Sequence, residues 1–288
     1  MSWGKIYDTT WWGNTGESNG WGNVYPVSSY DAATQALLDQ ATTDGYTAAS
    51  GSVLTALDNL IIALKADGIW TKVDILYVMA TNGDVDFATY NLKDPTTFKL
   101  TNNGATFTSL EGFTGDGVND YLNTGWQPSV DASQFTQNAA SFGVYQRTNT
   151  AGDLDVMMSS NQTVANRRTI YADWNRVSNP DYKYCTGSSA TSSDSNVSNV
   201  GLNFINRANS TQIAVYTDGT LFETISSTST SSFSAVDTTI LASNNNGAIS
   251  RHSVNQCSMA FIGGDLSAEA SDFYNAIQAY MTSLGKQV

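Results

Sequence analysis

Two groups of closely spaced oxygen side chains could bind a metal ion. The first has carboxylates at Asp84 and Asp86, and the second has carboxylates at Asp116 and Asp120. Calcium prefers oxygen ligands at such close spacing. Neither group continues to the Glu at the twelfth position that completes an EF-hand loop, and aspartates also stabilise ordinary turns. We therefore treat these four residues as candidate calcium ligands, with a turn-forming role as the alternative, and expect no other cofactor.

A third group of residues could bind a sugar. Asp173, Trp174 and Asn175 are followed by Tyr182. An aromatic ring beside amide and carboxylate groups suits a saccharide, because the ring packs on the sugar while the polar groups bond its hydroxyls. Trp174 could equally be a core or interface residue. These four residues are the candidate glycan-binding residues.

Groupings that could catalyse a reaction are scarce. The single histidine, His252, lies in a polar stretch typical of a surface loop, so neither a histidine-dependent triad nor a histidine-based metal site is expected. Asp153 and Asp155 would share one face of a strand, and glycoside hydrolysis needs only two carboxylates. A solvated strand edge explains this pair more simply. We interpret Cys185 and Cys257 as buried free thiols, with a single bridge between them left open.

The composition excludes several classes of protein. The formal net charge is −13, which repels phosphate backbones and argues against nucleic-acid binding. Ser, Thr and Asn together make up 93 of the 288 residues, and these types compete with the helical backbone, so a mostly helical protein is excluded. No apolar stretch of about 18 residues is present, so no membrane span is expected. The first residues also lack the pattern of a secretory signal.

Residues 1–28 are rich in tryptophan and glycine. Four of the seven tryptophans are found here, at Trp3, Trp11, Trp12 and Trp21. The segment has neither a helical nor a strand period, and so short a stretch cannot cover four indoles with its own side chains. Tryptophan is enriched at interface hot spots. Either the segment packs across the main domain, or it docks the protein to a partner subunit, which is the role we assign to it.

Residues 29–80 form the helical part of the sequence. Asp31 can cap a helix that runs to about Thr43. Ser50 or Ser52 can cap a second helix, in which apolar residues from Val53 to Leu64 recur with a period near 3.6. The dense apolar stretch 73–79 must be buried, but its periodicity does not distinguish a short helix from a strand.

Residues 81–288 are predicted to form an antiparallel jelly roll with a closing helix. Short alternating segments separated by Gly, Asn and Ser turns are typical of a β-sandwich. Among them, 212–217 and 220–225 flank Asp218-Gly219, which is a strong signal for a two-residue hairpin. Ser267 can cap the closing helix, whose apolar stripe ends at Gly285. We expect this helix to lie on the sandwich or against the helix at 53–66.

Four ordered segments resemble a module of tailed-phage and prophage virion proteins. They are residues 57–72, 113–125, 215–219 and 280–288. In that module a helical pair precedes a concanavalin A-like (laminin G-like) jelly roll, and a helix closes the chain. The resemblance covers about residues 30–288 and does not include the tryptophan-rich start. The fold class it implies is mainly β, with an N-terminal helical pair and a C-terminal helix.

The resemblance also implies a function. It points to a virion structural protein, such as a head or tail fibre, a head spike or a decoration subunit, made in the host cytoplasm and placed on the particle surface. Such a protein is expected to be a homo-oligomer, to contact other virion subunits through residues 1–28, and to contribute to host attachment. Folds of this type often bind carbohydrate, sometimes with Ca²⁺. A lectin-like module that binds capsule or lipopolysaccharide is therefore the alternative.

A glycoside hydrolase is the remaining alternative. The glucanases that share the concanavalin A-like fold place their catalytic carboxylates on one strand in a Glu-x-Asp-x-x-Glu pattern. This chain contains no such pattern, and its four Glu residues are scattered singly. We therefore expect that the protein is not an enzyme.

Overall fold

The structure of this chain is a computed structural model that describes most of residues 30–288. Its described ranges are 30–150, 155–162, 200–226, 228–229 and 233–288, with only the backbone given for 168–171, 182–183 and 191–192. The tryptophans at positions 3, 11, 12 and 21 and the glycan candidates Asp173, Trp174 and Asn175 lie outside these ranges. All the elements below belong to the unit Asp31–Val288.

The larger sheet of the described part has eight antiparallel strands. In spatial order they are β13 (Thr220–Ser226), β12 (Gln212–Thr217), β11 (Gly201–Arg207), β6 (Ala140–Gln146), β17 (Gln256–Gly263), β4 (Gly112–Thr114) and β3 (Thr106–Thr108), with β1 (Val73–Val78) also paired to β17. The strand expected at 105–110 is thus only three residues long.

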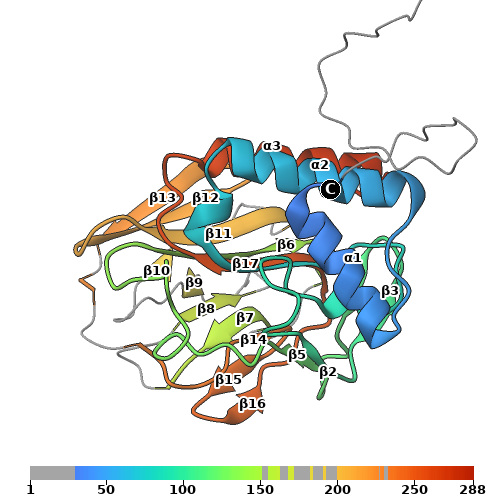
Figure 1. The fold of residues 1–288 in the computed structure, drawn as a ribbon. Coiled ribbons are helices and arrows are strands. Elements are labelled where there is room, and N and C mark those ends of the chain that lie inside the picture. Colours follow the sequence, from blue (N-terminus) through green and yellow to red (C-terminus); the bar gives the residue numbers. More distant parts are fainter. Residues whose placement is uncertain are drawn as a thin grey trace, which may run out of the picture. The chain divides into compact units, whose positions relative to one another are not determined.

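A second antiparallel sheet faces the first (Figure 1). Its strands are β2 (Thr101–Asn103), β5 (Tyr121–Asn123), β14 (Thr239–Ile240), β7 (Val156–Ser160) and β8 (Arg168–Tyr171). Two short ladders complete the set, β9 (Tyr182–Lys183) with β10 (Thr191–Ser192), and β15 (Ser243–Asn245) with β16 (Ala248–Ser250). The prediction of a mainly β, antiparallel sandwich is confirmed.

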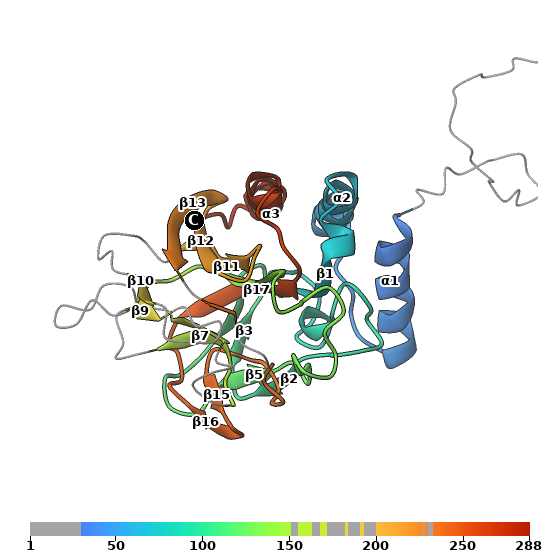
Figure 2. The same cartoon turned by 90° about the vertical axis from the view of Figure 1, so that its left-hand side faces the viewer.

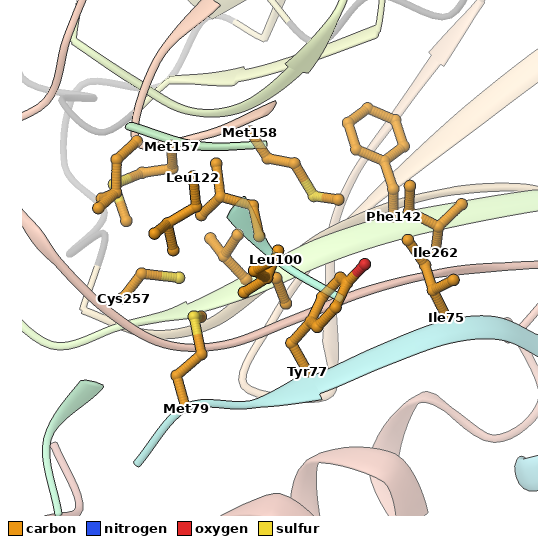
Figure 3. Packing of buried hydrophobic residues seen from close by; sticks show 14 of the residues in the cluster. Ile75, Tyr77, Met79, Leu100, Leu122, Phe142, Met157, Met158, Cys257 and Ile262 are labelled. Atoms are coloured by element: carbon orange, nitrogen blue, oxygen red, sulfur yellow. The ribbon is translucent and has the colours of Figure 1, made fainter. Parts of the chain in front are cut away.

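The two sheets bury an apolar core between them. Figure 3 shows Phe142 and Ile262 of the larger sheet packing toward Met158 and Leu122 of the smaller one, and all four are at most 2% exposed. Cys257 belongs to the same core and is a free thiol, and burial raises its pKa to about 12.

The burial of strand β1 on both faces explains why residues 73–79 show no hydrophobic period. Ile75 and Tyr77 face the core between the sheets. Leu76 and Val78, which alternate with them, are also buried. Because a strand covered on both faces needs apolar residues at every position, it lacks alternation. The predicted helical stretch 29–80 therefore ends in a strand of the sandwich.

Three α-helices accompany the sheets: α1 (Ala32–Asp44), α2 (Gly51–Ala66) and α3 (Ala270–Ser283). Two single turns of 3₁₀ helix, η1 (Trp70–Lys72) and η2 (Phe87–Thr89), flank β1. Asp31 caps α1 as predicted, since its side chain accepts the N–H of Ala33 at 2.8 Å. Ser50 is the first flanking residue of α2, although its side chain makes no capping bond.

The start of α3 was predicted wrongly. The flanking residue is Glu269, and Ser267 lies in the preceding turn. This turn is fixed by Asp265, whose carboxylate accepts the N–H of Ser267 at 2.9 Å, so Ser267 does not act as the helix cap. None of the helices in the described ranges combines the length and hydrophobicity that a bilayer crossing needs.

Helices α2 and α3 lie side by side and cover the outer face of the larger sheet (Figures 1 and 2). Helix α3 contacts the sheet through aromatic rings. The ring of Phe273 from α3 meets Phe261 edge-on with centroids 4.7 Å apart, and Phe261 in turn packs against Phe204 at 5.8 Å. Tyr280 of α3 also donates its hydroxyl to the carbonyl of Ala80 at 2.6 Å.

Gly143 makes room for this aromatic cluster. A Cβ at position 143 would lie 2.3 Å from the Cβ of Phe204 and 2.7 Å from the ring of Phe261. Both distances are far below a van der Waals contact, so any side chain here would displace the rings on which α3 rests.

The C-terminal residues are clamped to the sandwich by charge. Lys286 pairs with Glu111 at 2.5 Å, and Arg147 contacts the other oxygen of the same carboxylate at 3.2 Å. The hydrogen bond from Lys286, supported by the charge of Arg147, outweighs burial and lowers the pKa of Glu111. These ion pairs thus connect Lys286, through Glu111 just before β4, to Arg147 just after β6.

We expect Gly143→Ala to lower the free energy of unfolding by about 1–3 kcal/mol, because the new methyl group overpacks the aromatic cluster. Urea unfolding measures this loss. The double variant Gly143→Ala with Phe261→Leu should lose less than the sum of the two single variants, since leucine lacks the ring atom of Phe261 that the new methyl group would meet at 2.7 Å. Equal stability of Gly143→Ala and the parent would contradict the packing described here.

We expect Glu111→Gln to cost about 1 kcal/mol at pH 7, because the variant loses both ion pairs. A carboxyl with a lowered folded-state pKa stabilises the fold above its unfolded pKa, and this contribution disappears as the pH falls through the folded value. Parent and variant should therefore converge in urea unfolding as the pH falls below the folded-state pKa of Glu111. Asp67→Asn also removes one negative charge, at an exposed position away from these ion pairs, and as the control it should unfold like the parent at pH 7.

Candidate functional site

The aspartates at 84 and 86 lie in a turn that fastens the connection between α1 and α2. Asp84 accepts the N–H of Thr47 at 2.5 Å and the N–H of Phe87 at 2.8 Å. Asp86 is the flanking residue of η2 and is exposed. Both carboxylate oxygens of Asp84 therefore already accept a hydrogen bond from a backbone N–H group.

The aspartates at 116 and 120 lie in another turn. One oxygen of Asp116 accepts the N–H groups of Val118, Asn119 and Asp120 at 2.8–3.0 Å, and these bonds lower the pKa of Asp116. Burial and the neighbouring charge of Asp116 raise the pKa of Asp120. Within the described ranges no three acidic, histidine or cysteine side chains gather into a metal-binding group. Calcium binding at these four aspartates stays a prediction.

Of the remaining candidate residues, some lie inside the described ranges and others outside them. Asp153, Cys185 and residues 173–175 lie outside the described ranges, and of Tyr182 only the backbone, in β9, is described. Asp155 is 7% exposed, with a long 3.4 Å bond from the N–H of Val254. His252 is half-buried, and its Nδ1 lies 3.1 Å from the carbonyl oxygen of Asp120.

A polar cavity opens on the outer face of the larger sheet, over β11, β12 and β13. Its volume is about 140 Å³. Its polar lining includes Asn209, Gln212, Tyr216, Thr224 and Ser267, with Leu221 and two alanines as apolar neighbours. We call it the β12 pocket. Its lining residues in the described ranges carry no charge.

The floor of the β12 pocket follows from the strand pattern. Gln212, Ala214 and Tyr216 alternate along β12 and so share the outer face, while Ile213 and Val215 enter the core. Thr224 of β13 is the cross-strand partner of Ala214. The hollow exists because a methyl group stands where a longer side chain would fill the space.

One wall of the β12 pocket is a rigid turn between β11 and β12. A single side-chain oxygen of Asn209 accepts the N–H and the hydroxyl of Thr211, and also the N–H of Gln212, all at 2.9–3.0 Å. The guanidinium of Arg207 donates to the backbone carbonyl of Asn209 at 3.3 Å. The turn therefore holds its shape without a ligand.

The opposite wall is the segment that leads into α3. Asn206 donates to Asp265 at 2.7 Å and accepts the N–H of Leu266 at 2.8 Å, so β11 fixes the loop that carries Ser267. Tyr216 is held by stacking on Phe204, with centroids 4.8 Å apart and rings nearly parallel. Burial, aided by the charge of Asp265, raises the pKa of the Tyr216 hydroxyl and keeps it protonated.

Several polar groups of the β12 pocket have no hydrogen-bond partner among the residues that the structure describes. In the ranges that the structure describes, no hydrogen bond is made by the side chain of Gln212 or by the hydroxyls of Tyr216 and Thr224. Amide and hydroxyl groups both donate and accept. The pocket can therefore bind a neutral ligand rich in hydroxyls.

A larger groove, about 590 Å³, lies between α2 and α3. Two of the hydroxyls in its lining are already used by the helices themselves. Thr55 donates to the carbonyl of Gly51, and Ser283 donates to the carbonyl of Tyr280. The groove is therefore a weaker candidate for a polar ligand than the β12 pocket.

Sequence reasoning missed the β12 pocket. Its residues extend from Asn206 to Ser267, so no local motif contains them. One signal was present, because β12 and β13 were predicted as a hairpin whose outward positions include Gln212 and Thr224. A small Ala214 between larger outward residues could have marked the hollow.

No protein-family model and no curated protein sequence matches this chain. Among solved structures it is similar to a sialidase of Trypanosoma rangeli. A mutant with trans-sialidase activity matches at 10% identity with a TM-score of 0.53, covering 79% of this chain and 39% of the sialidase. The sialidase in complex with sialic acid matches at 10% identity with a TM-score of 0.50, covering 77% and 38%.

The chain is also similar to domain 4 of an extracellular arabinanase from Geobacillus stearothermophilus, solved in complex with arabinotriose. This match has 9% identity and a TM-score of 0.46, and it covers 70% of this chain and 98% of that domain. The chain thus spans about two fifths of the sialidase it resembles. None of these matches points to a phage virion protein. At such identities the sialidase matches show the fold alone, which is an antiparallel β-sandwich of the jelly-roll kind.

Proposed function

We propose that this chain is a non-catalytic subunit of a phage-like particle, of the fibre, spike or decoration type, whose β-sandwich attaches the particle to host glycans. The observation that carries the binding role is the β12 pocket, a preformed hollow lined by neutral amide and hydroxyl groups. Small-ligand sites are typically concave and largely preformed, with a few well-placed polar groups. Capsule or lipopolysaccharide would supply the hydroxyls.

The particle role is supported by the sequence. The four segments shared with tailed-phage virion modules occur in the same order here, and the Ser, Thr and Asn content gives a neutral surface suited to a particle coat. Made in the host cytoplasm, the subunit would form homo-oligomers on the particle surface and contact other virion subunits through residues 1–28. A lectin-like module outside any particle is the alternative, since the sialidase of which one part has a similar fold was solved in complex with sialic acid.

The absence of catalysis is part of the proposal. Of the three glutamates in the described ranges, Glu111 is paired with Lys286 and Arg147, and Glu269 is paired with Lys72 at 2.6 Å. The third, Glu223 of β13, makes no ion pair with the described residues. Glycoside hydrolysis needs two carboxylates that flank the scissile bond, and two of these three are committed to ion pairs.

We expect the full chain to bind immobilised capsular polysaccharide or lipopolysaccharide of its host on a glycan array, and to release no reducing sugar from them. The single variants Asp153→Asn and Asp155→Asn should leave binding unchanged. Turnover that is lost in either variant would establish the glycosidase alternative, and a lack of binding to any glycan would refute the attachment role.

We expect deletion of residues 1–28 to leave a folded domain that no longer assembles. The reason is that Trp3, Trp11, Trp12 and Trp21 lack local cover in the sequence and are assigned to a partner interface. Circular dichroism checks the fold, and co-purification with particles checks assembly. Loss of folding in the deletion variant would refute the docking role.

A further inference from the structure

The charge around the β12 pocket bears on which sugars it can accept. The carboxylate of Asp265 lies beside the lining. It accepts the N–H of Ser267, and its charge raises the pKa of Tyr216. Despite burial, its bonds from Ser267 and Asn206 lower the pKa of Asp265, so it stays charged at neutral pH. Among the lining residues that the structure describes there is no cation, and the neighbouring basic groups are already engaged, Lys72 with Glu269 and Arg207 with the carbonyl of Asn209.

We infer that the β12 pocket binds one neutral sugar residue and excludes sugars that carry a carboxylate. This inference rests on the proposed function and names the ligand class of the same site. A neutral glycosyl unit presents hydroxyls to Gln212 and Thr224, and its apolar C–H face meets Leu221, which is 51% exposed. A sialic or uronic acid would bring its carboxylate toward Asp265 without a basic partner, which costs free energy.

The size of the hollow agrees with a single unit. At about 140 Å³ the pocket is smaller than the sites of drug-sized ligands, which start near 300 Å³. Its walls are fixed by the bonds of Asn209 and Asn206, so they need no ordering when a ligand enters. A short polysaccharide end or a side branch fits this geometry better than the middle of an acidic chain.

The test uses the full chain and methyl glycosides as probes. Methyl glucoside, galactoside and mannoside are compared with N-acetylneuraminic acid and glucuronic acid by ligand-observed NMR titration. At least one neutral glycoside should bind, and both acids should bind at least tenfold more weakly. A parallel glycan array with neutral and acidic polysaccharides distinguishes a free sugar from a polysaccharide end as the natural ligand.

Two variants change the pocket itself. Ala214→Leu should fill the hollow and weaken binding at least tenfold, and Thr224→Ala should weaken it about three- to tenfold by removing one hydrogen-bonding group. Thr220→Ala on the same strand and the exposed Ala248→Leu on β16 are matched controls outside the pocket, and both should bind like the parent. Thermal unfolding confirms that each variant is folded.

The outcomes separate the two proposals. If polysaccharides bind but Ala214→Leu binds equally well, the site assignment is wrong and the glycan-binding function stands. If acidic sugars bind as tightly as neutral ones and Ala214→Leu abolishes both, the selectivity is wrong and the site stands. If no glycan binds at all, both proposals fail.

Discussion

The central strands of the eight-stranded sheet, β6, β11 and β17, are apolar enough that both of their faces must be covered, and the rest of the structure depends on this constraint. Its inner face packs on the second sheet, and its outer face packs under α2 and α3 (Figure 2). The outer contact depends on three rings, Phe204, Phe261 and Phe273, which meet over Gly143. Apolar burial of this kind is the main favourable term in folding. The helices are thus the third layer of one folded unit.

The same aromatic cluster positions the β12 pocket. Phe204 supports α3 on one side and stacks on Tyr216 on the other, so one residue links the helical cover to the lining of the hollow. Where α3 covers the sheet, the outer face is apolar. Beyond it, over β12 and β13, the outward residues are Gln212 and Thr224, and the face becomes a polar surface. The site lies where the helical cover gives way to the polar face.

The many short polar residues have two uses. Some form the outward faces and turns that the composition suggested. Others are buried and bond the backbone where strands end. Asn255, fully buried, accepts the N–H of Thr150 and donates to its carbonyl, and Asn91 accepts the N–H groups of Leu76 and Lys93. Because buried backbone groups must be paired, asparagine side chains can replace the missing ladder partners in a sandwich of short strands.

The sequence by itself determined the elements with strong local signals. The helices α1 and α2, the β-sandwich class and the hairpin at Asp218-Gly219 follow from capping, periodicity and turn chemistry. Both turn residues have a positive φ, as the two-residue hairpin requires. Local signals were weaker where a segment is buried on two faces, as in β1, or where a loop is fixed from outside, as at Ser267.

Only the tertiary structure decided which polar groups meet. The four candidate calcium ligands are local in sequence, and the structure gives the side chains of Asp84 and Asp116 backbone partners within their own turns. The β12 pocket instead joins residues from β11, β12, β13 and the lead into α3, up to 61 positions apart. No spacing rule contains such a set, because strand pairing and helix packing, rather than neighbouring residues, bring these side chains together.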